Sequence, residues 1–348
     1  MSATDEYDFE LPESSIAQEP AAERSASRAL FLTRGHDALE TASFDELPER
    51  LRGDECLVVN DTRVIPARLV GRRGEAKVEA TLLKAVGEDR WRAFARPGRR
   101  LRVGDRLVFG DAFQATLDAK LEGGEVELGF DLTGDALLDA IKRHGAPPLP
   151  PYIKRPDGAH AGDVEDYQTA FAEKDGAVAA PTASLHFTPR LLEALDAAGV
   201  GRATVTLHVG AGTFLPVKTD DIAAHKMHSE WGEVSAGAVE AIEAARQAGG
   251  RIIAAGTTAL RILEAASAEG RLKSFQGETD IFIRPGYRFR AVDGLMTNFH
   301  LPKSTLFMLV SALMGRERML AAYAHAIEQR YRFFSYGDSS LLLPEARP

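Results

Sequence analysis

The chain of 348 residues contains a single cysteine, Cys56, which excludes an internal disulfide. Such sparse cysteine usage is typical of proteins in a reducing compartment. Cys56 stands in the apolar run CLVV. We therefore expect a buried structural thiol rather than a nucleophile.

Long apolar runs are also missing, since none approaches the roughly 20 residues that a membrane helix needs. The first residues, MSATDEYDFELPESS, are acidic and lack the basic and apolar regions of a signal peptide. We expect a cytoplasmic protein that makes no contact with a membrane.

Signature motifs of several enzyme classes are absent as well. The chain has no G-x-G-x-x-G or P-loop motif, no H-E-x-x-H zinc motif and no G-x-S-x-G nucleophile turn. An acyl-transfer triad is therefore not expected, and any catalytic site must be found from clusters of polar residues.

Charge is distributed unevenly along the chain. Hydrophobic residues make up 45% and charged residues 27%, as in ordinary globular proteins, and the net charge is −9. Between Arg63 and Gly110, however, 13 basic residues face 5 acidic ones, a local charge of +8. Short alternating segments run from Arg63 to about Pro147, which predicts a small antiparallel barrel. The prolines around Pro150 then form a stiff return linker.

The rest of the chain alternates strands with helices. Thr188 with Pro189, and later Ser235, are predicted helix starts. We predict an α/β fold with a mixed-sheet body and an inserted small antiparallel β-barrel domain. The predicted body is residues 1–62 plus 148–348, and the predicted insert is residues 63–147.

Arginines gather on one loop of the predicted barrel, next to Trp91 and Phe94. Exposed basic residues beside aromatics suit a nucleic-acid backbone, although the same charges would also solubilise an edge strand. In the segment RWRAFAR the aromatic side chains are expected to point into the barrel core. The candidate contacts to nucleic acid are Arg96, Arg99, Arg100 and Arg102.

The stretch from residue 204 to 233 is the most suggestive part of the chain. An alternating strand pattern runs into Gly210, Gly212 and Thr213, and glycines at a strand end let backbone N–H groups approach a ligand. Three histidines and a carboxylate surround this break: His208, His225, His228 and Glu230. We predict a small-molecule site at this strand end.

Other strand ends carry further candidates. Gly256, Thr257 and Thr258 begin a helix, where a carboxylate or phosphate would be favoured. The polar group Asn60-Asp61-Thr62-Arg63 follows a strand abruptly, and is either a solvated turn or part of the site. Turn residues after two more apolar segments are Thr182, Ser184, His186, Thr297, Asn298 and His300.

Three functions compete for these residues. His208, His225, His228 and Glu230 are potential ligands of a hydrolytic zinc ion, but Lys226 separates two of the histidines and no cysteine ligand is present. A metal-free site using imidazoles for proton transfer is the main prediction. A non-catalytic RNA-binding adaptor would use the basic module alone.

Ordered blocks spread from residue 7 to 338 resemble a known family. They include LVVNDTRVIPARL, PPLPPYIKR, GAVAAPTASLHF, LHVGAGTFLPVK, HKMHSEW, GTTALRILE, LMTNFHLPKSTLFMLVSALMG and YRFFSYGD. On these blocks the chain resembles the S-adenosylmethionine:tRNA ribosyltransferase-isomerase family of queuosine biosynthesis. Only the basic module aligns loosely.

The resemblance implies a specific reaction. The ribosyl group of S-adenosylmethionine is transferred to 7-aminomethyl-7-deazaguanine at the wobble position of tRNA and rearranged to an epoxycyclopentanediol, with release of adenine and methionine. S-adenosylmethionine is then a consumed co-substrate, no further cofactor or metal is expected, and tRNA is the macromolecular partner. We expect a monomer.

The reaction assigns expected roles to the candidate residues. Proton transfer falls to His208, His228 and Glu230, with His186 and His300 next. Gly256, Thr257 and Thr258, helped by Arg261, would hold the methionine carboxylate. The remaining substrate contacts would come from Gly210, Gly212, Thr213, His225, Thr182, Ser184, Thr297 and Asn298.

Overall fold

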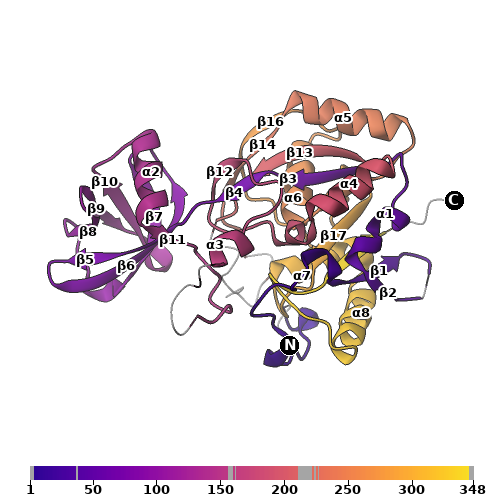
Figure 1. The fold of residues 1–348 in the computed structure, drawn as a ribbon, viewed down its shortest axis with the longest axis horizontal. Helices are drawn as coiled ribbons and strands as arrows, with labels where there is room; N and C mark the ends of the chain where they lie inside the picture. The colour runs from indigo at the N-terminus through magenta and orange to yellow at the C-terminus, as the bar shows by residue number, and fades with distance from the viewer. Residues whose placement is uncertain are drawn as a thin grey trace.

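The computed structural model describes residues 4–36, 38–155, 160, 162–210, 222, 225 and 227–344. A small barrel lies to one side of a larger body that carries most of the helices (Figure 1). The predicted fold class, a mixed-sheet α/β body with an inserted antiparallel barrel, is confirmed.

In the described residues, nine strands form the sheet of the body. Their order is β16 (Phe275–Thr279), β14 (Glu230–Val234), β13 (Gly201–Leu207), β3 (Cys56–Asn60), β15 (Ile252–Ala255), β17 (Gly294–Asn298), β18 (Ser339–Leu343), β1 (Arg28–Thr33) and β2 (Glu40–Ser43). The pairs β13–β3, β3–β15, β15–β17 and β18–β1 are parallel, and the other neighbours are antiparallel.

Helices cover both faces of this sheet, which explains why its central strands β3, β15 and β17 are buried along their whole length. In β3, Leu57 and Val59 pack with α1 (Leu47–Arg50) and α4 (Pro189–Ala197). Cys56 and Val58 point to the opposite face. There the core includes α5 (Ala236–Gln247), α6 (Thr257–Ala266), α7 (Thr305–Met314) and α8 (Arg316–Glu328). Cys56 is the buried thiol that was expected, and burial raises its pKa to about 11.

The predicted helix starts are confirmed. The Thr188 hydroxyl accepts a hydrogen bond from the Leu191 N–H, and the Ser235 hydroxyl accepts one from Ala238. Among the described residues, no helix combines the length and apolar character that crossing a bilayer requires.

Six strands close the barrel. In order they are β5 (Arg68–Arg73), β6 (Ala76–Ala85), β7 (Arg90–Arg96), β10 (Glu125–Phe130), β9 (Phe113–Lys120) and β8 (Arg106–Gly110). Arg72 pairs with Val108 to join β8 back to β5. A Cβ at Gly71 would lie 2.2 Å from the Val108 carbonyl oxygen, so this closure requires glycine. Helix α2 (Gly134–His144) and β11 (Gly145–Ala146), which pairs with β5, complete the unit.

The two aromatics of RWRAFAR face different ways. Trp91 is buried with Ala93 and Ala95 in the barrel core, as predicted. Phe94 is only half-buried, because it alternates out of phase with them along β7, so the prediction of an inward ring was wrong for this residue.

Short strands β4 (Thr62–Val64) and β12 (Lys174–Ala177) form a parallel pair on the side of the body that faces the barrel (Figure 1). The division of the chain after residue 62 and before residue 148 stays a prediction. The remaining short elements are η1 (Asp5–Tyr7), η2 (Glu13–Ser15), η3 (Arg24–Ala26), η4 (Phe44–Glu46), η5 (Gly98–Arg100), η6 (Glu122–Gly124), α3 (Asp163–Asp166) and η7 (Thr182–His186).

Candidate active site

One edge of the nine-stranded sheet gathers most of the candidate residues. The parallel strands β13, β3, β15 and β17 all end at this edge, while β14, β18 and β1 begin there. Ligands of open α/β sheets commonly bind beyond the carboxyl ends of strands. Residues 61–67 alone separate the end of β3 from the first barrel strand, so this edge lies toward the barrel.

His208 immediately follows β13 and is held on several sides. Its Nδ1 lies 2.7 Å from the Thr62 hydroxyl oxygen, and its ring stacks on Trp231 with 5.1 Å between centroids. Burial, and secondarily the nearby Lys174 cation, lower the pKa of His208 to about 4, against the opposing effect of Asp175 and Glu233. The imidazole is therefore neutral at physiological pH.

The turn after β3 is buried rather than solvated. Asn60 ties β3 to β13, because its Oδ1 accepts from the N–H groups of Leu207 and Thr62 and its Nδ2 donates to the Leu207 carbonyl. Asp61 accepts from the Thr206 hydroxyl at 2.7 Å. Burial raises the pKa of Asp61, although this hydrogen bond and the Lys174 cation act the other way. The turn thus builds the sheet edge from within.

Glu230, the first residue of β14, connects two other candidates. One carboxylate oxygen accepts from the Gly210 backbone N–H at 3.1 Å, and the other lies 2.6 Å from an Arg261 guanidinium nitrogen. Both charged side chains are buried. Arg261 is therefore ion-paired with Glu230, while its Nε and Nη2 have no hydrogen-bond partner among the described residues.

Helix α6 begins at the same edge. Gly256 precedes it with a φ of 99°, a conformation that favours glycine. Thr257 and Thr258 form its first turn, and the buried Thr258 hydroxyl has no hydrogen-bond partner among the described residues. Ser184 of η7 donates to the Ala255 carbonyl at 3.4 Å, which brings η7 beside this helix start.

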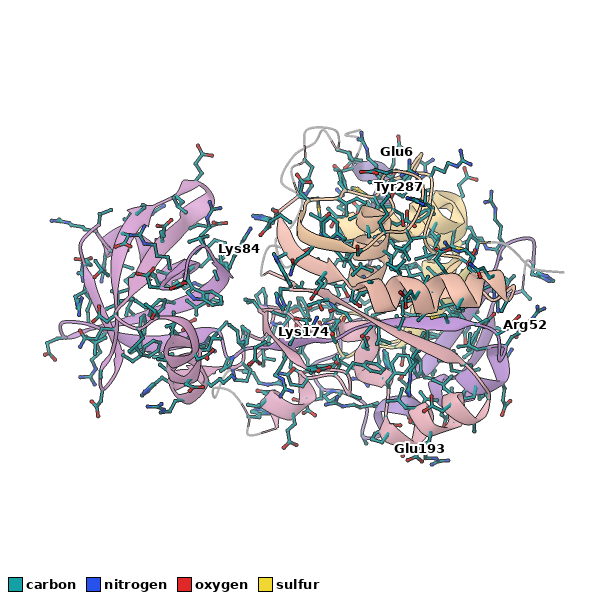
Figure 2. The ribbon with its side chains drawn as sticks, turned by 90° about the horizontal axis from the view of Figure 1, so that it is seen from above. Glu6, Arg52, Lys84, Lys174, Glu193 and Tyr287 are labelled. Carbon is teal, nitrogen blue, oxygen red and sulfur yellow. The ribbon has the colours of Figure 1, made fainter. Side chains whose placement is uncertain are left out.

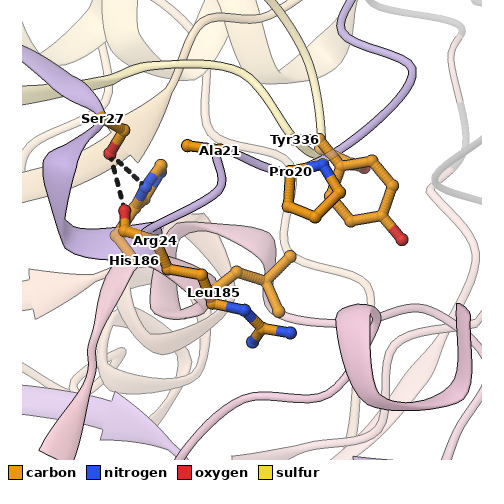
Figure 3. A pocket seen from close by; sticks show the side chains of 8 residues that line it. Pro20, Ala21, Arg24, Ser27, Leu185, His186 and Tyr336 are labelled. Carbon is orange, nitrogen blue, oxygen red and sulfur yellow. Dashed lines mark hydrogen bonds between the residues drawn. The ribbon is translucent and has the colours of Figure 1, made fainter. Parts of the chain in front are cut away.

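His186, at the end of η7, lines a small pocket (Figure 3). The Ser27 hydroxyl lies 2.7 Å from its Nδ1 and 3.1 Å from the Arg24 carbonyl oxygen, as the dashed lines show. Its ring packs on Phe44, and burial lowers its pKa to about 4. Thr182, at the start of η7, is half-buried. The other lining residues are Pro20, Ala21, Leu185, Ser335 and Tyr336.

The end of β17 carries three more candidates. His300 Nε2 lies 3.0 Å from the Thr297 hydroxyl, and burial lowers the pKa of His300 to about 3. The amide nitrogen of Asn298 donates to the backbone carbonyls of Phe334 and Ser335. These contacts hold the strand end in place, so the three side chains are mainly engaged with the protein itself.

The histidine loop is less enclosed. His228 is exposed, whereas His225 is half-buried with its ring edge-on to Phe282 at 5.4 Å. Burial, and then the neighbouring His228, lower the pKa of His225. Gly212 and Thr213 lie outside the described residues.

A contact links this loop to the barrel. Glu278 of β16 accepts from the Ser229 hydroxyl at 2.5 Å and pairs with Lys84 of barrel strand β6 at 2.7 Å. In Figure 2, Lys84 lies on the side of the barrel that faces the body, and Lys174 lies at the end of the body nearest the barrel. A second link joins Lys142 of α2 to Asp175 of β12 at 2.7 Å.

The four arginines predicted to contact nucleic acid are all exposed, on or just before the loop from β7 to β8. None of them forms an ion pair with a described carboxylate, whereas their neighbours Arg73 and Arg106 pair with Asp105 and Asp131. The residues concerned are Arg96, Arg99, Arg100 and Arg102.

Sequence reasoning missed three neighbours of the candidate site, Trp231, Lys174 and Ser27, and left the role of Thr62 open. Thr62 carried a signal, since it belongs to the polar group that follows β3 abruptly. No local pattern reveals the other three, because strand pairing and long-range contacts bring them to this edge from distant parts of the chain. They are Trp231, Lys174 and Ser27.

Among the described residues, no group of three histidine, cysteine, aspartate or glutamate side chains is arranged to hold a metal ion. Two of the four proposed ligands are engaged otherwise, because Thr62 meets His208 Nδ1 and Arg261 pairs with Glu230. These contacts do not favour the metal-dependent hydrolase.

Comparison with known proteins identifies the family. The family described as "Queuosine biosynthesis protein" matches residues 4–342. An S-adenosylmethionine:tRNA ribosyltransferase-isomerase of Rhizorhabdus wittichii is 58% identical over 98% of this chain and 99% of its own length. The same enzyme of Rhodospirillum rubrum is 58% identical over 97% of both chains.

A solved structure agrees with these relatives. The crystal structure of an S-adenosylmethionine tRNA ribosyltransferase from Thermotoga maritima is 36% identical, covers 97% of this chain and 100% of its own, and has a TM-score of 0.57. The chain therefore belongs to the S-adenosylmethionine:tRNA ribosyltransferase-isomerase family of queuosine biosynthesis.

Proposed function

We propose that this protein transfers the ribosyl group of S-adenosylmethionine to the aminomethyl arm of 7-aminomethyl-7-deazaguanine at the wobble position of tRNA. The ribose is isomerised to the epoxycyclopentanediol of epoxyqueuosine, and adenine and methionine leave. The observation that carries this proposal is that nearly the whole chain matches relatives named S-adenosylmethionine:tRNA ribosyltransferase-isomerase.

The reaction needs several proton movements. The sulfonium acidifies the adjacent ribose carbon, adenine must be protonated as it leaves, and the attacking ammonium must lose protons before a C–N bond forms. Imidazoles suit these tasks, and we assign them first to His208 and His228, with His186 and His300 next. For Glu230, its contacts with Gly210 and Arg261 support a positioning role for the adjoining loop.

We place the methionine carboxylate at the start of α6. Free N–H groups and the helix dipole favour an anion there, and the unpartnered Thr258 hydroxyl provides a further donor. The proposed contacts to the nucleoside are unchanged: Gly210, Gly212, Thr213, His225, Thr182, Ser184, Thr297 and Asn298.

We propose that tRNA binds across the barrel and the body. The exposed arginines between β7 and β8 would contact phosphates, and the short connection from β3 to β5 sets the barrel beside the candidate edge. We further propose that the protein is a cytoplasmic monomer. It would consume S-adenosylmethionine as co-substrate and need no bound cofactor.

Incubation of the protein with S-adenosylmethionine and tRNA carrying the deazaguanine precursor tests the reaction. Mass analysis of the nucleosides should show epoxyqueuosine, with one adenine and one methionine released per modified tRNA. Chelator-treated protein should retain this activity. Tight tRNA binding without adenine release would instead indicate an adaptor, and activity lost on chelation and restored by zinc would indicate a metal enzyme.

A further inference from the structure

The hydroxyl group of Thr62 is positioned to control the imidazole of His208. Thr62 is fully buried, and its Oγ1 lies 2.7 Å from His208 Nδ1. Its backbone N–H donates to Asn60 Oδ1 at 3.1 Å, and it pairs in register with Lys174 of β12. The backbone of Thr62 is therefore held by its own turn and by strand β12, which fixes where the hydroxyl can lie.

The imidazole is confined from other directions too. The Trp231 indole stacks on one face at an interplanar angle of 20°, and the backbone N–H of His208 donates to the Trp231 carbonyl at 2.9 Å. Gly176 lies over the Nε2 half of the ring so closely that a Cβ there would lie 2.8 Å from Nε2 and 2.9 Å from both Cδ2 and Cε1. Little rotation of the ring is possible without displacing β12 or the indole.

The direction of the hydrogen bond follows from the surroundings of Thr62. A buried hydroxyl that donates to nothing is costly, and among the described residues His208 Nδ1 is the sole acceptor within reach of Oγ1. The hydroxyl therefore donates and Nδ1 accepts. In a neutral imidazole whose Nδ1 accepts, the proton lies on Nε2.

We propose that Thr62 is a positioning residue that holds neutral His208 in the Nε2-protonated tautomer, so that this imidazole presents an N–H donor to the reacting nucleoside. A neutral imidazole donor stabilises negative charge that develops on an acceptor, here the departing adenine. This inference rests on the proposed function. It makes His208 the hydrogen-bond donor to the departing adenine, so that another group must remove the protons.

The test combines a spectroscopic readout with kinetics. In protein labelled with ¹⁵N-histidine, the His208 signals, identified by their loss in His208→Asn, should show a protonated Nε2 and a pyridine-type Nδ1. Thr62→Val, of nearly the same shape, should give mixed tautomers and lower kcat at least tenfold, with KM for both substrates changed less than threefold. Thr62→Ser should restore both readouts.

A matched control separates positioning from general destabilisation. Thr206→Val also removes a buried hydroxyl that donates a hydrogen bond, to Asp61, yet it should leave the tautomer of His208 unchanged. A protonated Nδ1 in the native protein, or Thr62→Val with native kcat, would overturn the proposal. Failure of the native protein to modify tRNA would instead refute the proposed function, whatever the tautomer.

Discussion

Arg261 and Glu230 form a buried ion pair, with 2.6 Å between a guanidinium nitrogen and a carboxylate oxygen and side chains only 3% and 4% exposed. The pair joins the second turn of α6 to the start of β14, and Glu230 also holds the Gly210 backbone. It thereby connects the proposed carboxylate site to the loop that follows β13.

Breaking this pair from one side should be strongly destabilising. Arg261→Met leaves a buried carboxylate without its cation, which costs about 3–5 kcal/mol in such pairs. The double variant Arg261→Met/Glu230→Gln should recover most of this loss, because no uncompensated charge remains. Urea unfolding of the two single variants and the double variant measures the coupling, and simple additivity would show that the two charges do not depend on each other.

If the methionine carboxylate binds at the start of α6, a substitution there should weaken binding of S-adenosylmethionine without destabilising the free protein. Thr258→Val removes a buried hydroxyl that has no described partner, so the free protein should lose little or no stability. Binding of S-adenosylmethionine should weaken about tenfold, which corresponds to about 1.4 kcal/mol. Calorimetric titration measures both affinities.

Ser311 supplies the control for that experiment. Its hydroxyl is likewise buried without a described partner, but it lies within α7 and outside the proposed carboxylate site at the start of α6. Ser311→Ala should therefore change neither stability nor affinity. Equal affinities for native protein and Thr258→Val would remove this hydroxyl from the substrate site.

Local patterns in the sequence predicted much of this architecture. The apolar run of β3, the caps at Thr188 and Ser235 and the alternation around Trp91 each depend on neighbouring residues, which a sequence displays directly.

What the sequence could not show depends on long-range pairing. Trp231 reaches His208 only because β14 pairs antiparallel with β13, and Ser27 reaches His186 only because β1 lies beside β18. The sequence left open whether the Asn60 group is a solvated turn or part of the site, because its partners on β13 lie far away in the chain. Strand order therefore determined which polar residues lie together at the candidate site.

Buried histidines predict a steep acid limit to stability. His186, His208 and His300 have pKa values lowered to about 4, about 4 and about 3, chiefly by burial. In the unfolded chain they take up protons near pH 6.5, so unfolding binds protons as the pH falls from about 6.5 toward 4 and the free energy of unfolding falls with it. Three such groups give up to about 4 kcal/mol per pH unit.

The contribution of one histidine can be isolated by substitution. His186→Asn should reduce the slope of unfolding free energy against pH by about 1.4 kcal/mol per pH unit between pH 4.5 and about 6. Substitution of the exposed His36 serves as the control. Because Asp61 and Glu264 have raised pKa values and act in the opposite direction, the difference between variants is the decisive quantity. An unchanged slope in His186→Asn would show that this imidazole titrates alike in both states.

The barrel surface predicts how tRNA affinity should depend on salt. Arg99, Arg100 and Arg102 are exposed and have no described ion-pair partner, so they are free to replace counterions on phosphates. Changing all three to alanine should weaken tRNA binding and reduce the slope of log affinity against log salt by about one per lost contact, as measured by filter binding across a salt series.

Arg90 and Arg92 provide a matched substitution on the same barrel. They are also exposed, but Arg90 lies 3.7 Å from Glu127 and Arg92 lies 4.0 Å from Glu125, so acidic neighbours already offset their charge. Their replacement by alanine should leave the salt slope nearly unchanged. A triple variant at Arg99, Arg100 and Arg102 that keeps the native slope would move the tRNA contact away from this loop, whereas equal losses per arginine removed in the two variants would indicate a diffuse field rather than a defined contact surface.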